Sequence, residues 1–257
     1  MPPLLTDLQS GTLTIRFNRP ERANAFNFEM LAALRDTLAQ ATRDPGIRAV
    51  VMTGVGTSFC AGHDVGEMLA AQEQGISYQK HLQETYNPLI LQIRQLEKPV
   101  LAALNGPAAG AGLGVALACD LRFAADTASF TIGFSGIGLV PDSGVSLLLP
   151  ALIGLGRAME FSLTNQPISA DLALQWGMVN RVFPASILQS EIDQFIAAVT
   201  RGPVGTFGLT KRLYNHTMLP NLADALEKES EFQEIASKSA EHTNGVKRFM
   251  KKSGRKS

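Results

Sequence analysis

The sequence predicts an α/β protein with a helical C-terminal region. Strand-like and helix-like patterns alternate through the first two thirds of the chain, as repeated β-β-α or β-α units require. From Ser186 onward the strand patterns stop and helical patterns continue. The chain has 257 residues, 45% of them hydrophobic, which is enough for one large core. We therefore expect a core over residues 1–185 and a helical region over residues 186–257.

The first elements follow from side-chain periodicity. Residues 12–18 alternate apolar and polar side chains, which predicts a strand with one buried face. The next apolar residues recur at helical spacing before turn residues at 44–46 end the helix; they are Leu31, Leu34, Leu38 and Ala41. Residues 49–53 predict a short central strand, because they are almost all apolar.

The middle of the chain continues this alternation. Residues 72–77 are polar and predict a mobile stretch, and a long helix is expected over residues 78–96, with a bend at Pro88. Further strands are expected at residues 99–104, 121–124 and 129–131. Helices are expected in the C-terminal region at residues 187–199, 207–214, 222–240 and 246–251.

Composition excludes several classes of function. The formal net charge is zero, which argues against a general nucleic-acid or membrane-surface role. The basic run over residues 247–256 is either a solvated tail or a local phosphate contact. Cys60 and Cys119 give no disulfide framework, and neither a signal-peptide pattern nor a membrane-length apolar run occurs. We expect a cytoplasmic protein.

A glycine-rich stretch is the most informative part of the chain. The apolar residues 99–104 lead into residues 105–117, where glycine and alanine stand at nearly every position. Small residues allow another group to approach the main chain. A helix that begins there presents unpaired N–H groups, which favour negative charge. We infer that this charge is a transient oxyanion rather than a phosphate.

Other chemistries fit the sequence poorly. No P-loop lysine follows the glycines, and the dinucleotide fingerprint fails because Val115 stands where its last glycine belongs. No G-x-S-x-G motif occurs. The histidines are scattered without ligand spacing, so no metal site is expected; they are His63, His81, His216 and His242.

Two separate loops offer backbone donors next to small residues. Residues 61–63 and residues 110–112 each follow a predicted strand. If these strands are neighbours, the two N–H groups converge on one carbonyl oxygen, an arrangement that stabilises an enolate. Taken alone, each loop is also compatible with a plain turn.

Four ordered motifs resemble those of the crotonase (enoyl-CoA hydratase/isomerase) superfamily. They lie at residues 59–64, 98–106, 110–112 and 138–142, and the resemblance runs from about residue 13 to residue 252. It implies a crotonase-type ββα spiral core with a C-terminal helical region. It also implies an acyl-CoA substrate, no other cofactor, and trimers or dimers of trimers, with residues 186–257 as the trimerisation region.

The resemblance also assigns site residues. The backbone N–H groups of His63 and Ala111 correspond to the oxyanion hole, which makes the His63 side chain a bystander. Asp142 corresponds to an acidic residue that several isomerases of the family use as a base. The implied coenzyme A contacts, some of which the family often draws from an adjacent subunit, are Arg22, Ala23, Ala25, Ala61, Asp64, Gly110, Phe249 and Lys252.

Departures from the family pattern narrow the reaction. Hydratases of the family carry glutamates where this chain has Gly114 and Phe134, and neither residue can activate water or donate a proton. A double-bond shift needs only one carboxyl group. An apolar pocket around Phe134 and Val140 would raise the pKa of Asp142. Without the resemblance, the favoured interpretation of Asp142 is a helix N-cap.

Residues 86–89, 108–112, 134–135 and 138–142 resemble most strongly the isomerase branch that acts on ring-epoxidised phenylacetyl-CoA. We therefore expect an isomerase that shifts a β,γ double bond to the α,β position. The alternatives are a hydratase-like enzyme, a non-catalytic acyl-CoA-binding subunit and an RNA-binding member of the superfamily. A chlorobenzoyl-CoA dehalogenase fits less well, because that group pairs its aspartate with a histidine where this chain has Asn87, and with a tryptophan at Phe134.

Overall fold

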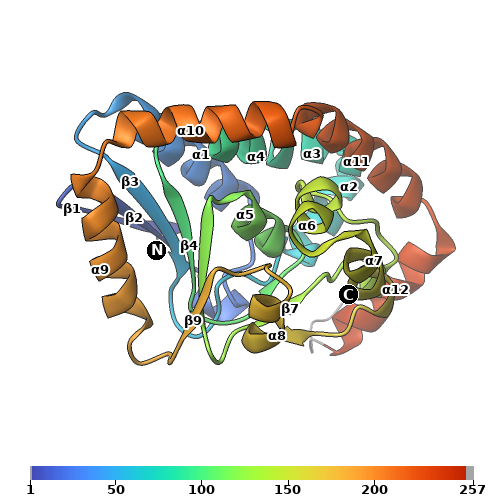
Figure 1. Ribbon diagram of the computed structural model, residues 1–257. Coiled ribbons are helices and arrows are strands. Elements are labelled where there is room, and N and C mark those ends of the chain that lie inside the picture. Colours follow the sequence, from blue (N-terminus) through green and yellow to red (C-terminus); the bar gives the residue numbers. More distant parts are fainter. Residues whose placement is uncertain (1, 253–257) are drawn as a thin grey trace.

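The computed structural model describes residues 2–252 and contains one large sheet flanked by helices (Figure 1). The large sheet has six strands in the order β1-β2-β3-β4-β6-β9. These strands are β1 (Leu4–Gln9), β2 (Thr12–Phe17), β3 (Ala49–Gly54), β4 (Val100–Leu104), β6 (Leu121–Ala125) and β9 (Arg181–Phe183). A second sheet contains β5 (Ala108–Ala109), β7 (Ser129–Thr131) and β8 (Ile168–Ser169).

Helices connect the strands and then form the C-terminal region. The helices between strands are α1 (Phe28–Arg43), α2 (Val65–Glu73), α3 (Tyr78–Glu84), α4 (Tyr86–Gln95), α5 (Ala111–Ala118), α6 (Val145–Ile153), α7 (Leu155–Thr164) and α8 (Ala170–Gln175). After β9 come α9 (Leu188–Arg201), α10 (Val204–Met218), α11 (Leu222–Ser237) and α12 (Ala240–Lys252). Strands and helices alternate as far as β9, and only helices follow it, as the sequence patterns predict.

The hairpin of β1 and β2 was not predicted. The two strands pair antiparallel through a turn in which Ser10 and Gly11 both have positive φ. From β2 onward the strands of the large sheet are parallel. Since parallel strands place their carboxyl ends at one edge, the loops that follow β3 and β4 begin at the same edge of the sheet.

The core fills both faces of the large sheet. One face packs against α9, which contributes Leu188, Ile192 and Ile196 to a cluster with Val51 and Phe123. The opposite face carries the larger cluster, which includes the buried apolar side of α1 and the packed rings of Phe17, Phe26 and Phe59. Helix α10 runs along one side of the molecule next to α4 (Figure 1).

The expected long helix over residues 78–96 is two helices, and the break is at Thr85 rather than Pro88. Thr85 has φ −121° and ψ −72° and separates α3 from α4. Pro88 stands in the first turn of α4, where a missing N–H costs no helical bond. Its ring would clash with the carbonyl four residues earlier in a continuous helix. That carbonyl belongs to Glu84 and accepts a hydrogen bond from Arg35 instead, at 2.8 Å.

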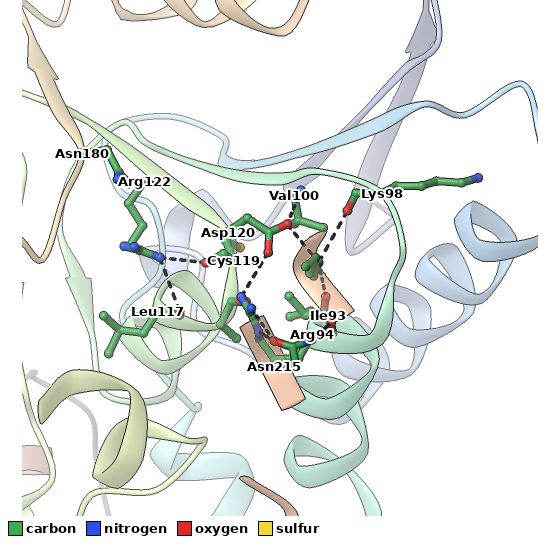
Figure 2. A network of polar contacts seen from close by, with 12 residues as sticks. Ile93, Arg94, Lys98, Val100, Leu117, Cys119, Asp120, Arg122, Asn180 and Asn215 are labelled. Atoms are coloured by element: carbon green, nitrogen blue, oxygen red, sulfur yellow. Dashed lines mark hydrogen bonds and ion pairs between the residues drawn. The ribbon is translucent and has the colours of Figure 1, made fainter. Parts of the chain in front are cut away.

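A network of charged side chains ties α10 to the sheet (Figure 2). The carboxylate of Asp120 accepts hydrogen bonds from Arg94 at 3.1 Å and Lys211 at 2.9 Å. It also accepts the backbone N–H of Val100. Arg94 in turn donates to the side chain of Asn215 on α10. This network fixes α4 and α10 against the end of the sheet at which β4 and β6 begin.

The C-terminal helices fold back onto the core rather than extending from it. Helix α11 packs against α3, α4 and α6, and α12 packs against the short 3₁₀ helix Ser135–Ile137. A Cβ atom on Gly138 would lie 2.5 Å from the backbone nitrogen of His242, so glycine allows this close approach. None of the helices within residues 2–252 is long and apolar enough to cross a membrane.

Candidate active site

A cavity of about 520 Å³ lies between the loops at the carboxyl edge of the sheet and helices α3, α11 and α12. Most of its wall is apolar. The residues that line it are Ala61, Gly62, His63, Val65, Met68, Tyr78, His81, Leu82, Tyr86, Ala109, Gly110, Ala111, Thr131, Gly133, Phe134, Gly136, Ile137, Leu139, Asp142, Asn165, Gln233, Arg248 and Phe249. The two predicted donor loops and Asp142 therefore share one cavity.

The first loop presents the backbone of His63. Phe26 donates to the carbonyl of Gly62 at 2.7 Å, and Asp64 donates to the carbonyl of Phe26 at 2.8 Å. These two bonds form a parallel bridge between Phe26 and His63. Neighbouring residues of an extended chain point their N–H groups in opposite directions, so the His63 N–H faces away from Phe26.

The second loop brings the start of α5 to the first. Ala111 is the first residue of α5, so its N–H has no intrahelical acceptor. A Cβ atom on Gly62 would lie 3.1 Å from the carbonyl oxygen of Ala109 and 3.6 Å from the nitrogen of Ala111. Gly62 (φ +97°) and Gly110 (φ +52°) adopt backbone conformations that favour glycine. Within residues 2–252, neither the His63 nor the Ala111 N–H donates to a protein acceptor.

Asp142 is buried in the cavity wall with both carboxyl oxygens hydrogen-bonded. Ser143 donates its hydroxyl to Oδ1 at 2.7 Å, and Gln233 donates its amide to Oδ2 at 2.6 Å. The other side of the Gln233 amide accepts the N–H of Val140 at 3.0 Å, which fixes its orientation. Among the described residues, Asp142 is the only carboxyl group that lines the cavity.

Burial raises the pKa of Asp142 from 3.8 to about 7. The dominant cause is desolvation of the charged form, and the negative charge of Glu229 acts in the same direction. The hydrogen bonds from Ser143 and Gln233 act against it. An apolar pocket at Phe134 is confirmed, whereas Val140 is not part of the cavity wall. The carboxyl group is therefore able both to take and to return a proton near neutral pH.

Asp142 does not cap the helix that follows it. Glu229 on α11 accepts the N–H groups of Gly144 at 2.8 Å and Ser146 at 2.9 Å, at the start of α6. This buried carboxylate performs the capping role that the sequence left open for Asp142. Burial raises the pKa of Glu229 as well. The side chain of Asp142 is consequently free to face the cavity.

The position of Gly114 has no room for a side chain. A Cβ atom there would lie 2.7 Å from both the Cβ and the carbonyl oxygen of Ser143. Phe134 contributes an apolar ring to the cavity. At the two positions where hydratases of the family carry glutamates, this chain therefore has a closely packed glycine, Gly114, and an aromatic side chain, Phe134.

An aromatic cluster forms another part of the cavity wall. His63 is hydrogen-bonded through Nδ1 to the hydroxyl of Tyr86 at 2.9 Å, and its ring centre lies 4.6 Å from that of His81. Phe28 meets His81 edge to face at 4.9 Å. Burial lowers the pKa of both histidines, to about 4 for His81 and well below 6.5 for His63. Both rings are therefore neutral at pH 7.

Only some of the predicted coenzyme A contacts line the cavity. Asp64 forms an ion pair with Arg19 at 3.1 Å and caps α2 through Gly66, so it has structural partners. Ala61 and Gly110 line the cavity, and so does Phe249, from α12 of the same chain. The remaining predicted contacts lie outside the cavity wall: Arg22 is exposed, Ala23 is half-buried and Ala25 is buried. The side chain of Lys252 is outside the described residues.

Sequence reasoning missed three residues of the site. Gln233 and Glu229 come from α11, about 90 positions after Asp142, and His81 comes from α3. One signal was present: polar residues at 229, 230 and 233 share one face of a helix that must pack on the core. Within residues 2–252, no group of three histidine, cysteine or acidic side chains is placed to hold a metal ion.

Comparison with known proteins identifies the family of this chain. The enoyl-CoA hydratase/isomerase family model matches residues 7–256. The chain belongs to the enoyl-CoA hydratase/isomerase family, and the crotonase-type fold expected from the sequence is confirmed.

Individual relatives differ in their reactions. A 1,2-epoxyphenylacetyl-CoA isomerase from Escherichia coli is 37% identical over 97% of this chain and 95% of its own length. A 4-chlorobenzoyl coenzyme A dehalogenase from an Arthrobacter species is 39% identical over 78% of this chain and 73% of its own length. The crystal structure of an enoyl-CoA hydratase from Mycobacterium avium subsp. paratuberculosis superposes with a TM-score of 0.87. It is 33% identical, and the match covers 97% of this chain and 96% of the other.

Proposed function

We propose that the protein is an acyl-CoA isomerase that moves a double bond from the β,γ to the α,β position of an enoyl-CoA thioester. One observation carries this proposal: the single carboxyl group of the described cavity wall, Asp142, has a pKa of about 7. It shares the cavity with two backbone loops suited to hold a thioester oxygen. The similarity to a 1,2-epoxyphenylacetyl-CoA isomerase over nearly the whole chain supports an isomerase acting on an acyl-CoA.

The proposed reaction needs one base. The carboxylate of Asp142 takes a proton from C2, and the electrons of the C–H bond move into the thioester carbonyl. The N–H groups of His63 and Ala111 stabilise the resulting oxyanion; one such donor typically contributes a factor of about 10²–10³ in rate. The protonated Asp142 then returns the proton to C4, which leaves the double bond between C2 and C3. No water enters the reaction.

Hydration and dehalogenation are weaker candidates. Hydration requires a group to activate water and another to protonate carbon, and Gly114 has no room for a second carboxyl. In the dehalogenases the aspartate works with a histidine at the position of Asn87. Here the amide of Asn87 is buried and donates to Leu226 and Ser230 on α11, outside the cavity wall.

The test is incubation with a β,γ-enoyl-CoA and detection of the conjugated thioester by its ultraviolet absorbance, with crotonyl-CoA hydration as the comparison. We expect isomerisation in the wild type. In Asp142→Asn the isomerisation rate should fall by about 10²–10⁴-fold, while acyl-CoA binding is retained. Asp171→Asn, an exposed substitution on α8, serves as the matched control. Undiminished turnover in Asp142→Asn would remove this residue from the mechanism.

The remaining expectations belong to the same proposal. We propose that the enzyme is cytoplasmic, uses no cofactor beyond the coenzyme A of its substrate, and assembles as a trimer or a dimer of trimers. Large apolar side chains stand exposed on α10 and α11 and would suit subunit contacts; they include Leu213, Tyr214, Met218, Phe232 and Ile235. Light scattering at several protein concentrations measures the assembly directly.

A further inference from the structure

His81 is the one buried histidine of the cavity wall whose two ring nitrogens both lack a hydrogen-bond partner among the described residues. Its side chain is 3% exposed. Buried polar atoms are normally hydrogen-bonded, because an unpaired one loses its bonds to water without replacement. The exception therefore needs an explanation.

Aromatic packing does not explain why a residue with two unpaired nitrogens stands at position 81. Its ring meets Phe28 at 4.9 Å and Tyr86 at 5.5 Å, both near edge-to-face, and lies beside His63. A phenylalanine would make the same aromatic contacts without burying two unpaired polar atoms. A charge switch does not explain them either, since burial keeps the pKa of His81 at about 4.

The neighbours of His81 do not use its nitrogens. The hydroxyl of Tyr86 is already paired with Nδ1 of His63 at 2.9 Å. The carboxylate of Glu67 accepts the backbone N–H of Phe28 and lies 3.9 Å from Nε2 of His63. A neutral imidazole offers one N–H donor and one acceptor. Both of these groups on His81 are thus unpaired among the described residues. Each nitrogen is itself buried, so a bound molecule reaches it when the ring turns further into the cavity.

We propose that His81 is a specificity residue that binds a neutral oxygen of the acyl group, such as a hydroxyl, ether or carbonyl. The proposal rests on the proposed function in placing an acyl-CoA in this cavity, and it narrows the substrate class to oxygen-bearing acyl thioesters. A carboxylate fits less well, because His81 is uncharged and Arg248, the only lysine or arginine among the described lining residues, is exposed.

The test measures binding rather than turnover, so that it stands apart from the isomerase assay. Calorimetry compares hexanoyl-CoA with hexanoyl thioesters that carry one hydroxyl at the fourth, fifth or terminal carbon. We expect at least one hydroxylated thioester to bind the wild type about tenfold more tightly, as one or two hydrogen bonds allow. The preference should vanish in His81→Phe and return in part in His81→Gln, which restores a donor and an acceptor.

His216→Phe is the matched control, because His216 is exposed on α10, and it should keep the preference. The proposal is overturned if no hydroxylated thioester binds the wild type better than hexanoyl-CoA, or if folded His81→Phe keeps the full preference. A failed isomerase assay with a retained hydroxyl preference would reject the proposed reaction and leave this subsite standing. Isomerase activity without the hydroxyl preference would reject this subsite and leave the proposed reaction standing.

Discussion

At the scale of single residues, two opposing influences set the pKa of the Asp142 carboxyl group. Two hydrogen-bond donors hold it, and apolar side chains surround it. Burial raises its pKa, while Ser143 and Gln233 stabilise the charged form. Their balance leaves the pKa at about 7. A base near neutrality transfers protons efficiently in both directions, which suits the proposed transfer of one proton from C2 to C4.

The pH profile of the proposed isomerisation should follow this group. Because the ionised form takes the proton, kcat/KM should rise with pH and level off above about 7. Gln233→Leu removes a hydrogen bond that lowers the pKa, so the midpoint should move to higher pH. Gln189→Leu, on the exposed side of α9, should leave the midpoint unchanged. An unmoved midpoint in Gln233→Leu would contradict the assigned hydrogen bond.

The same pKa shift makes Asp142 a cost to stability. The folded state keeps the proton up to about pH 7, whereas the unfolded chain releases it near 3.8. Stability therefore falls as pH rises between these values. At about 1.4 kcal/mol per pKa unit, the full cost is at most about 4 kcal/mol. Asp142→Asn should thus be more stable than the wild type at about pH 8.

Urea unfolding at about pH 5 and about pH 8 measures this effect. The gain in the free energy of unfolding from Asp142→Asn should be larger at the higher pH. Equal gains at both values would show that the carboxyl does not have a raised pKa in the folded protein.

At the scale of elements, the site depends on how closely α5 packs against the turn before α6. Gly114→Ala would place a methyl group 2.7 Å from Ser143, whose hydroxyl donates to Asp142. We expect a loss of about 1–3 kcal/mol in stability and a fall in kcat larger than the change in KM. Gly156→Ala on α7 meets no atom within 4 Å and should be neutral or slightly stabilising. Normal kcat in Gly114→Ala would show that this packing does not position the carboxyl.

Periodicity predicted most elements, because local side-chain patterns set them. The same patterns could not locate the break at Thr85, since it depends on the clash between Pro88 and a carbonyl one turn earlier. They also missed β1, whose residues Leu5 and Leu8 are exposed. A family motif marks the backbone at His63 and Ala111, and their role as donors to a thioester oxygen stays a prediction. Gln233 and His81 were not predictable, because tertiary packing alone brings them to the cavity.

At the scale of the whole molecule, the Asp120 network joins α4, α10 and the sheet (Figure 2). Lys211 is buried, and burial lowers its pKa while Asp120 opposes that shift. Removing one partner from a buried ion pair leaves an uncompensated charge. The network should therefore matter for stability rather than for chemistry.

Asp120→Asn should lower the free energy of unfolding by about 3 kcal/mol, with kcat of the folded enzyme nearly unchanged. Glu97→Gln breaks the exposed pair with Arg212 and should change stability by at most about 1 kcal/mol. Thermal and urea unfolding compare the two variants. Similar small effects from both would show that the buried network adds no more than a surface ion pair.

The proposed reaction requires that the carboxyl group of Asp142 carries one proton from C2 to C4. It is tested most directly with a β,γ-enoyl-CoA deuterated at C2, whose conjugated product is analysed by NMR after the first turnovers. We expect deuterium at C4 in a measurable fraction of the product, because the buried Asp142 holds the label before it exchanges with solvent. Product with only solvent hydrogen at C4, even at the earliest times, would contradict it.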